Sequence, residues 1–434
     1  MNVFSSLGSN YNFNFVLKAL FANNRETYKE KLINFLEKKY GGRPILVYKG
    51  REAIGLALEI LDLPKESAVA INGFTCFAVY KAVQTTGYKP LCLDLDNNLD
   101  LNFSASKLSK AIKQNPKIKV VIIQNTLGYP CDIEKIAKTC RENNLVLIED
   151  LAHCVGTKYK NGKEAGTIGD FVVLSFSQDK IIDAVSGGAL VIRNKKYHLA
   201  SQGDALRSNE VGGKTPRRWP KDSFEVDNNN GTMEQWNNDG SRQARTINLQ
   251  TLGLKDQLID RLYPLFTFII RKTYQTGIGK FIHFILKSLN LLSKPMNESF
   301  YAEYDLPSWY AYLVIEAFEN LNNNLKHRNE IASIYSSMLS SKITNQDINK
   351  NIHLSSNLRY PIFVENRKSL IGYLKKEGIY VSDIWYDSVD NSLKNAKIAS
   401  DTILNLPTHI NVSEKDAKRL AQKINQFFRH YPSP

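Results

Sequence analysis

The chain has 434 residues, of which 43% are hydrophobic and 23% are charged, so it can build a large domain and a smaller one with cores of ordinary composition. Its formal net charge of +14 favours an anionic partner such as a nucleotide sugar, a nucleic acid or an anionic membrane surface. The basic residues are dispersed and form no zinc finger or long Lys/Arg block, which argues against nucleic acid.

The cysteines and the lengths of the apolar runs indicate the cellular compartment in which we expect the protein. The five cysteines show no Cys-x-x-Cys spacing, so we expect reduced thiols without a disulfide framework or a metal site. The first residues lack the charged and apolar segments of a signal peptide. No run reaches the ~18 apolar residues that a membrane span needs. We therefore expect a cytoplasmic protein.

Short apolar runs alternate with helical segments through the first half of the chain. A helix is expected at Glu26–Tyr40, where apolar residues recur on one face. Strands that alternate with helices at this spacing predict a mainly parallel sheet with helices on both faces. The runs expected to form strands are Ile45–Tyr48, Ala68–Ile71, Pro90–Leu95, Val120–Ile123, Leu145–Ile148, Phe171–Phe176 and Ala189–Ile192.

Two of the segments that join a strand to a helix contain residues typical of a helix N-terminus. Gly50 follows the first strand and opens a helix, so its turn can present backbone N–H groups to an anion, with Arg51 adding positive charge. Asp132 precedes a helix at Ile133–Asn143 and is expected to cap it without a chemical role.

Ionisable residues follow two of the strands directly. Asp150 ends one strand, and Lys180 lies in the loop after the next. Ligands bind at the carboxyl ends of strands in parallel α/β sheets. An acid and an amine at neighbouring strand ends suit pyridoxal 5'-phosphate (PLP), which needs a Schiff-base lysine and an acidic partner for its ring nitrogen. Taken singly, a loop lysine is usually solvated and a strand-end aspartate is often a helix cap.

Three segments occur in an order that resembles a known family. They are Glu-Asp-x-Ala-His at 149–153, Ser-Phe-x-x-x-Lys at 175–180 and Ser-Gly-Gly at 186–188. The order is similar to that of the DegT/StrS-type nucleotide-sugar aminotransferases, which are PLP enzymes of fold type I. The resemblance implies an α/β, aspartate-aminotransferase-like large domain with a mainly parallel sheet, and a smaller α+β C-terminal domain.

The resemblance also implies roles for individual residues. Lys180 would hold the cofactor covalently and then act as the general base, and Asp150 would pair with the ring nitrogen. Ser175 would contact the cofactor phosphate, together with the turn at Gly50 and Arg51.

The chain departs from the usual family pattern at several positions. His153 stands where the family has glutamine and is expected to keep a hydrogen bond to the ring hydroxyl. Cys76 replaces an aromatic residue that stacks on the ring, so the adjacent Phe77 is expected either to take over the stacking or to be a plain core residue. Further departures fall at Lys49, Asn125 and Val185–Ser186.

The second half is expected to contain a long loop, an insert and a small domain. Residues 205–250 are rich in Gly, Pro and Asn and should form a surface loop that ends a large domain spanning 1–250. Residues 254–295 mix Leu, Ile and Phe with Lys and Arg, which predicts amphipathic helices within an insert at 251–296. These helices could lie on a membrane, pack on the parent domain or meet a second subunit. Residues 297–434 are expected to form the small domain.

The implied activity is that of a PLP-dependent aminotransferase. The resemblance suggests a homodimer that transfers an amino group, usually from glutamate, to a nucleotide-linked keto-sugar in surface polysaccharide or amino-sugar biosynthesis. A sugar dehydratase of the same fold is disfavoured because that branch replaces the lysine with histidine. A catalytically diverged or sensor-like relative is the alternative, because the chain departs from the family pattern at several positions.

Overall fold

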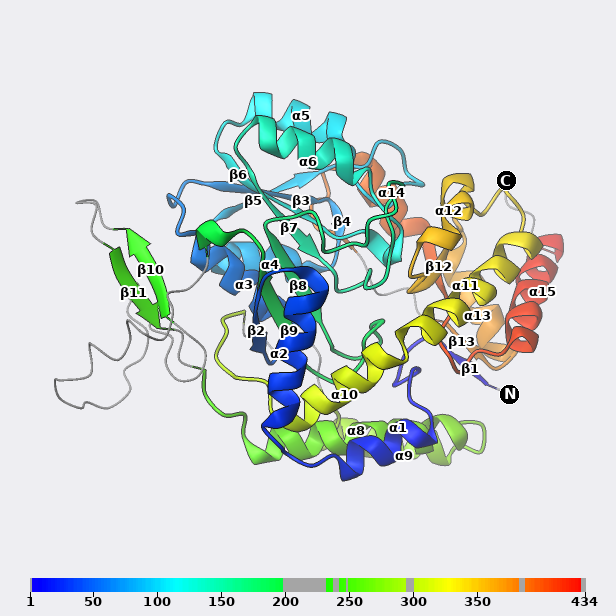
Figure 1. The fold of residues 1–434 in the computed structure, drawn as a ribbon. Coiled ribbons are helices and arrows are strands. Elements are labelled where there is room, and N and C mark those ends of the chain that lie inside the picture. Colours follow the sequence, from blue (N-terminus) through cyan, green and yellow to red (C-terminus); the bar gives the residue numbers. More distant parts are fainter. Residues whose placement is uncertain are drawn as a thin grey trace.

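The structure is a computed structural model that describes residues 2–197, 232–236, 242–246, 249–293, 300–381 and 387–430. A seven-stranded sheet lies at its centre with helices on both faces (Figure 1). All seven expected strands are present. In spatial order they are β2 (Arg43–Val47), β9 (Gly188–Ile192), β8 (Phe171–Ser175), β7 (Val146–Asp150), β6 (Ile118–Ile123), β3 (Ala68–Asn72) and β5 (Lys89–Leu93).

Most neighbouring strands of this sheet run parallel. The pairs β8–β7, β7–β6, β6–β3 and β3–β5 are parallel, whereas β9 is antiparallel to both of its neighbours. Because β6, β7 and β8 run in one direction, their carboxyl ends meet at one edge of the sheet. The expected α/β fold with a mainly parallel sheet is confirmed.

Alternate side chains of each strand enter two different cores. In β6, Val121 and Ile123 pack into the core on one face, whereas Val120 and Ile122 pack into the core on the other. The first face is covered by α2 (Thr27–Tyr40), α5 (Ala105–Gln114), α6 (Ile133–Glu142) and α10 (Ser308–Glu319). The second face is covered by α3 (Gly50–Leu61) and α4 (Phe77–Thr85). Strands buried on both faces explain the continuous apolar runs in the sequence.

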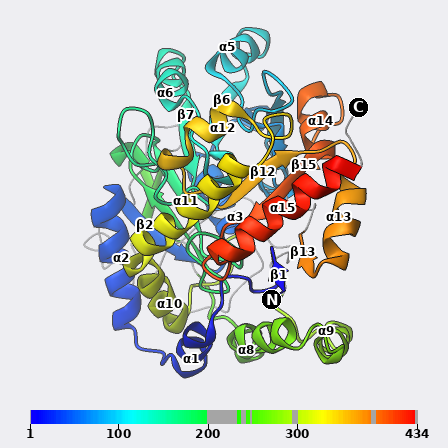
Figure 2. The same ribbon diagram turned by 90° about the vertical axis from the view of Figure 1, so that its right-hand side faces the viewer.

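A separate core lies under a smaller sheet near the C-terminus. Its strands β12 (Arg359–Phe363) and β15 (Ile403–Pro407) pair antiparallel. The helices on this core are α11 (Leu321–Met338), α13 (Arg367–Lys376), α14 (Lys394–Thr402) and α15 (Glu414–His430), with the short α12 (Gln346–Lys350) beside them. Figure 2 shows α11 and α15 side by side on this part of the molecule.

Two short strand pairs tie distant segments together. The N-terminal β1 (Val3–Phe4) pairs in parallel with β13 (Ile379–Tyr380), so the N-terminal segment reaches the smaller core. β4 (Phe74–Thr75) pairs antiparallel with β14 (Asp387–Ser388). Short 3-10 helices occur at Thr126–Gly128, Lys195–Tyr197 and Ile352–Leu354.

The expected insert contains two helices, as its amphipathic pattern predicts. α8 (Leu254–Lys272) packs beside α1 (Phe13–Phe21), and α9 (Ile278–Ser288) packs on α8. The buried Asp260 of α8 accepts hydrogen bonds from the hydroxyls of Tyr48 and Tyr310, each at 2.8 Å. Packing of α8 on the parent domain, one of the three expected possibilities, is therefore observed.

The segment before the insert differs in part from the expected loop. Residues 205–231 lie outside the described residues, but β10 (Thr232–Trp236) and β11 (Arg242–Thr246) form an antiparallel hairpin. The sequence between them contains Asp-Gly, a dipeptide favoured in hairpin turns, which composition alone did not separate from a loop. The division of the chain at residues 250 and 296 stays a prediction, while α10 packs on the large sheet.

Candidate active site

Asp150 is the last residue of β7, and its side chain is buried at the carboxyl edge of the sheet. Gln124 Nε2 donates to Asp150 Oδ2 at 3.0 Å, and the Ala152 N–H donates to Oδ1 at 3.0 Å. Burial raises the pKa of Asp150 above its ordinary value, and these donors and the Lys180 ammonium offset that only in part. A further cationic partner would therefore stabilise the ionised carboxylate.

The adjacent Glu149 has a different role, because successive strand residues face opposite sides of a sheet. Its carboxylate is fully buried and holds the chain segment that leads into β8. Its four donors are the hydroxyl of Tyr159 and the N–H groups of Gly166, Ile168 and Gly169, at 2.5–2.8 Å. Of the two neighbouring acids, only Asp150 faces the carboxyl edge where a ligand can bind.

Lys180 lies in the loop after β8, and its Nζ is 3.0 Å from Nε2 of the buried His153. Burial lowers the pKa of Lys180 below its ordinary value. Burial and the Lys180 charge hold the pKa of His153 well below its ordinary value, so the imidazole is neutral near pH 7. The structure thus brings together a readily deprotonated amine, a neutral imidazole and a buried acid. A covalent cofactor requires such an amine as its nucleophile.

The loop that carries Lys180 is anchored by the N-terminal segment. The Tyr11 hydroxyl donates to Asp183 Oδ1 at 2.8 Å, and Asn10 Nδ2 donates to Asp183 Oδ2 at 2.9 Å. Ser9 Oγ donates to Asp179 Oδ1 at 2.9 Å. Burial raises the pKa of Asp183 to about 7. Sequence analysis missed this anchor, because it joins residues about 170 positions apart.

Gly50, Ser175 and Gly188 meet in a tight cluster at the start of α3. A Cβ atom at Gly50 would lie 2.6 Å from Ser175 Cβ and 2.9 Å from its Oγ. A Cβ atom at Gly188 would lie 2.6 Å from the Gly50 nitrogen. Side chains at the two glycines would fill this cradle, in which helix N–H groups and a serine hydroxyl come together. That combination is suited to a phosphate group.

Phe77 is an exposed residue at the start of α4. Phe77 is 49% exposed and its ring stacks on Tyr80 of the same helix, with the centroids 5.9 Å apart. The Cys76 thiol is an electrostatic neighbour of both Lys180 and Arg51. Because Cys76 has the extended backbone of the position before α4 and Phe77 is the first helical residue, the two side chains leave the backbone in different directions. The core role expected for Phe77 is therefore not observed, and its stacking on the cofactor ring stays a prediction.

Gln124 is a site residue that sequence analysis did not single out. It follows directly after β6 and is buried, and it links the Thr75 hydroxyl to Asp150. The rule that selected Asp150, a polar residue at the carboxyl end of an apolar strand, also applies to Gln124. Asp132 caps α6 as expected, since its Oδ1 accepts from the Lys135 N–H.

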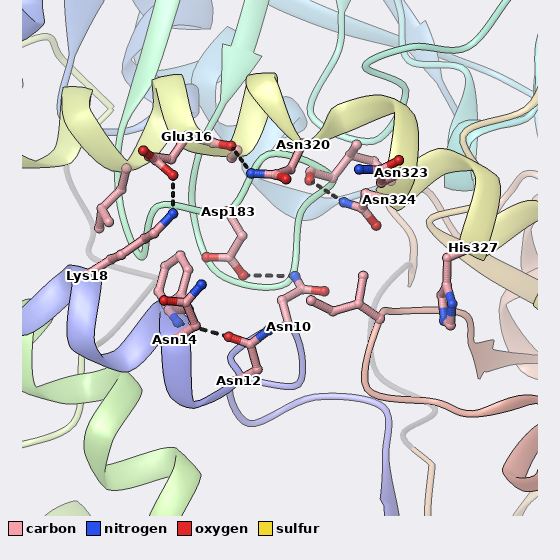
Figure 3. Close-up of a pocket in the computed structure, with 15 residues that line it drawn as sticks. Asn10, Asn12, Asn14, Lys18, Asp183, Glu316, Asn320, Asn323, Asn324 and His327 are labelled. Atoms are coloured by element: carbon pink, nitrogen blue, oxygen red, sulfur yellow. Dashed lines mark hydrogen bonds and ion pairs between the residues drawn. The ribbon is translucent and has the colours of Figure 1, made fainter.

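A pocket of about 350 Å³ lies on one side of the Lys180 loop, between α1, α10 and α11. Figure 3 shows Lys18 of α1 paired with Glu316 of α10, and Asn10 bonded to Asp183. Its lining includes Ile181 but not Lys180, so this pocket is a neighbour of the candidate site and not the site itself.

A second pocket of about 520 Å³ lies beside Gln178, two residues before Lys180. Its lining combines aromatic and basic side chains, namely Phe4, Tyr263, Tyr274, Tyr380, His283 and Lys287. No cluster of three or more potential metal ligands occurs in the part of the chain that the structure describes.

The residues at the sheet edge fit the requirements of PLP. The cradle at Gly50 and Ser175 suits its phosphate, and the buried Asp150 suits a protonated ring nitrogen. Lys180 Nζ lies 3.0 Å from His153 Nε2, and the Asp150 carboxylate is close enough to act on the pKa of Lys180. His153, which replaces the family's glutamine, is placed as a neutral hydrogen-bonding group.

The sequence profile of the DegT/DnrJ/EryC1/StrS aminotransferase family matches residues 19–226 and 294–425. The chain belongs to this family. The resemblance drawn from its sequence segments is thereby confirmed, and aminotransferases of this family use PLP. The stretch between the two matched ranges, 227–293, contains α8 and α9.

Individual relatives are similar over part of their length. GDP-perosamine synthase of Escherichia coli O157:H7 is 32% identical over 196 residues, which cover 44% of this chain and 53% of that protein. UDP-4-amino-4,6-dideoxy-N-acetyl-beta-L-altrosamine transaminase of Campylobacter jejuni subsp. jejuni serotype O:23/36 (strain 81-176) is 28% identical over 202 residues, covering 46% and 51%. The chain thus spans about half the length of the curated relatives it matches.

Solved structures share this fold. The PLP form of a putative sugar aminotransferase from Streptococcus pneumoniae covers 100% of both chains with a TM-score of 0.66 at 16% identity. A likeness at this identity establishes the fold and leaves the substrate open.

Proposed function

We propose that this chain is a PLP-dependent aminotransferase that acts on a nucleotide-linked keto-sugar. The observation that carries the proposal is the group at the sheet edge, in which Lys180 contacts His153 close to the buried Asp150. Membership of an aminotransferase family supports the reaction type.

Three observations support the substrate class. Two relatives carry GDP-linked and UDP-linked sugars in their names. The net charge of +14 favours an anionic diphosphate. The pocket beside Gln178 combines aromatic faces with the cationic Lys287, which suits a base and a phosphate. We further propose glutamate as the amino donor and surface polysaccharide or amino-sugar biosynthesis as the use of the product, in a cytoplasmic homodimer.

The protein's residues would divide the work as follows. When bound, PLP supplies an electron sink for negative charge at the substrate carbon. Lys180 Nζ would hold the cofactor and, once released, move a proton to and from that carbon, since its lowered pKa favours the free amine. His153 Nε2 would orient the amine through their 3.0 Å contact. Asp150 would keep a proton on the ring nitrogen. The donor's amino group would replace the sugar's carbonyl oxygen, and the donor would leave as a 2-oxo acid.

The assignment of Lys180 is tested by trapping the cofactor with borohydride and mapping the labelled peptide. Lys180→Ala should lose the visible absorbance band and all amino transfer while staying folded, because no neighbouring group supplies the same chemistry. Lys163→Ala is the matched control, since Lys163 is exposed in the segment before β8. A label on another lysine, or an active Lys180→Ala protein, contradicts the assignment. A parent protein without any absorbance band would favour the sensor-like alternative.

The substrate class is tested by direct titration. A nucleotide-linked keto-sugar should bind more tightly than a free 2-oxo acid of similar size, and added salt should weaken the sugar's binding by screening its phosphates. Equal affinity for both compounds would instead indicate an ordinary amino-acid transaminase.

A further inference from the structure

Exposed apolar side chains gather on one surface of the protein, formed by α1, α8, α9 and the residues just after α9. Among the described residues, twelve of the sixteen large apolar side chains that are exposed lie on this surface, which we call the α8–α9 face. They are Phe13, Leu17, Phe21, Leu254, Leu258, Ile269, Ile278, Phe281, Phe284, Ile285, Leu289 and Leu291. Exposed apolar patches of this kind mark a contact with a partner or a membrane.

The orientation of α9 follows from its packing. Gly279 and Leu286 are the buried residues of this helix, and a Cβ at Gly279 would lie 2.3 Å from the Ile270 carbonyl oxygen of α8. This close contact turns the opposite side of α9 outward. Phe281 and Phe284 are consequently 65% and 69% exposed. The helix is therefore held by the protein on one side and has an apolar stripe on the other.

The α8–α9 face is mainly positive, although the exposed Asp256 lies at the start of α8. Between residues 261 and 293 the sequence contains five basic residues and no Asp or Glu. Arg261 and Arg271 donate to the carbonyls of Ala22 and Tyr11, which lie at the two ends of α1. Lys272, Lys280 and Lys287 are exposed next to the apolar stripe. Aromatic and aliphatic side chains flanked by lysines are typical of helices that lie in a membrane interface.

The three helices form one layer at the edge of the molecule. Figure 1 shows α1, α8 and α9 together at the bottom, and Figure 2 shows them in a row at the bottom again, away from the large sheet. No described helix is long and apolar enough to cross a bilayer, so any membrane contact of the described residues is made from the surface. α8 and α9 also lie between the two ranges of the sequence that the family profile matches.

We propose that the α8–α9 face docks the enzyme on an anionic lipid membrane, with Phe281 and Phe284 entering the acyl boundary and with Lys272 and Lys280 meeting the headgroups. A second copy of the chain fits this face less well, because a two-fold contact would bring the same positive charges together. Nucleic acid also fits poorly, because protein surfaces that bind nucleic acid are polar, whereas this face is rich in exposed Phe, Ile and Leu.

The test is sedimentation of the full-length protein with lipid vesicles. Vesicles with roughly one third phosphatidylglycerol in phosphatidylcholine should bind the protein, pure phosphatidylcholine should bind it weakly, and added salt should reduce the binding. Phe281→Ser/Phe284→Ser and, separately, Lys272→Glu/Lys280→Glu should each weaken binding by about tenfold or more. Lys135→Glu/Lys138→Glu is the matched control, because it makes the same charge change on exposed lysines of α6, at the opposite end in Figure 1.

The outcomes separate the possible partners of the face. The proposal is supported if only the α8–α9 variants lose vesicle binding while amino transfer and the oligomeric state in solution stay unchanged. It is overturned if the parent protein ignores both kinds of vesicle, or if the α6 control loses binding equally. It is also overturned if the Phe281→Ser/Phe284→Ser protein changes its oligomeric state, since the face would then join two copies of the chain.

Discussion

Substitution of Gly50 by alanine tests the tight cluster that we assign to phosphate binding. The added Cβ would lie 2.6 Å from Ser175 Cβ, 2.9 Å from Ser175 Oγ and 3.0 Å from Ser175 Cα. Carbon atoms in contact normally lie about 3.5–4.0 Å apart, so roughly 1 Å of overlap must be relieved. Overpacking of this kind costs about 1–3 kcal/mol of unfolding free energy. Since the overlap involves the start of α3, PLP binding should weaken as well.

The assay is urea denaturation of the cofactor-free protein, followed by PLP titration. Ser175→Gly removes the Cβ and Oγ atoms that clash, so Gly50→Ala should cost less in that background, with a coupling free energy of about 0.5–3 kcal/mol. Gly372→Ala is the control, because Gly372 lies exposed within α13 with no atom within 4 Å of its added Cβ. Gly372→Ala should leave the free energy of unfolding unchanged or raise it by up to about 1 kcal/mol. If Gly50→Ala behaves like this control, or if its cost is unchanged by Ser175→Gly, the proposed contact is wrong.

Three further substitutions test other residues of the site. Glu149→Gln should lower the free energy of unfolding by about 2–4 kcal/mol in a urea titration without loss of cofactor trapping, because an amide replaces a carboxylate that accepts four hydrogen bonds. His153→Gln should keep the amino-transfer rate within about tenfold of the parent, whereas His153→Leu should lower kcat further and shift the pH–rate profile, since it leaves Lys180 Nζ without this partner. Asp183→Asn should remove a pH dependence of stability. Burial raises the pKa of Asp183 to about 7, so the folded protein keeps a proton that the unfolded chain loses near pH 4. As the pH rises between those two values, the free energy of unfolding of the parent protein should fall by up to roughly 4 kcal/mol. Urea midpoints that vary equally with pH in both proteins would contradict this.

Features governed by local sequence were predictable. The strands of the large sheet are buried on both faces, so each appears as a continuous apolar run, and their order with the intervening helices indicates a parallel sheet. Asp150 and Lys180 were identified by the same local rule, because the carboxyl ends of parallel strands meet at one edge. The amphipathic pattern of α8 and α9 was likewise visible as helical periodicity.

Tertiary structure alone decided how these local pieces meet. Val3 pairs with Ile379, and Tyr11 anchors Asp183 from 172 positions away. Contacts between residues so far apart in the chain leave no periodic pattern in the sequence. Cys76 and Phe77 are neighbours in sequence, yet which of them faces Lys180 depends on the point at which α4 begins. The sequence of α9 likewise shows an apolar stripe, but it does not show which part of the protein the helix packs against. Only the close contact of Gly279 with α8 determines which side of that helix is buried and which side is exposed.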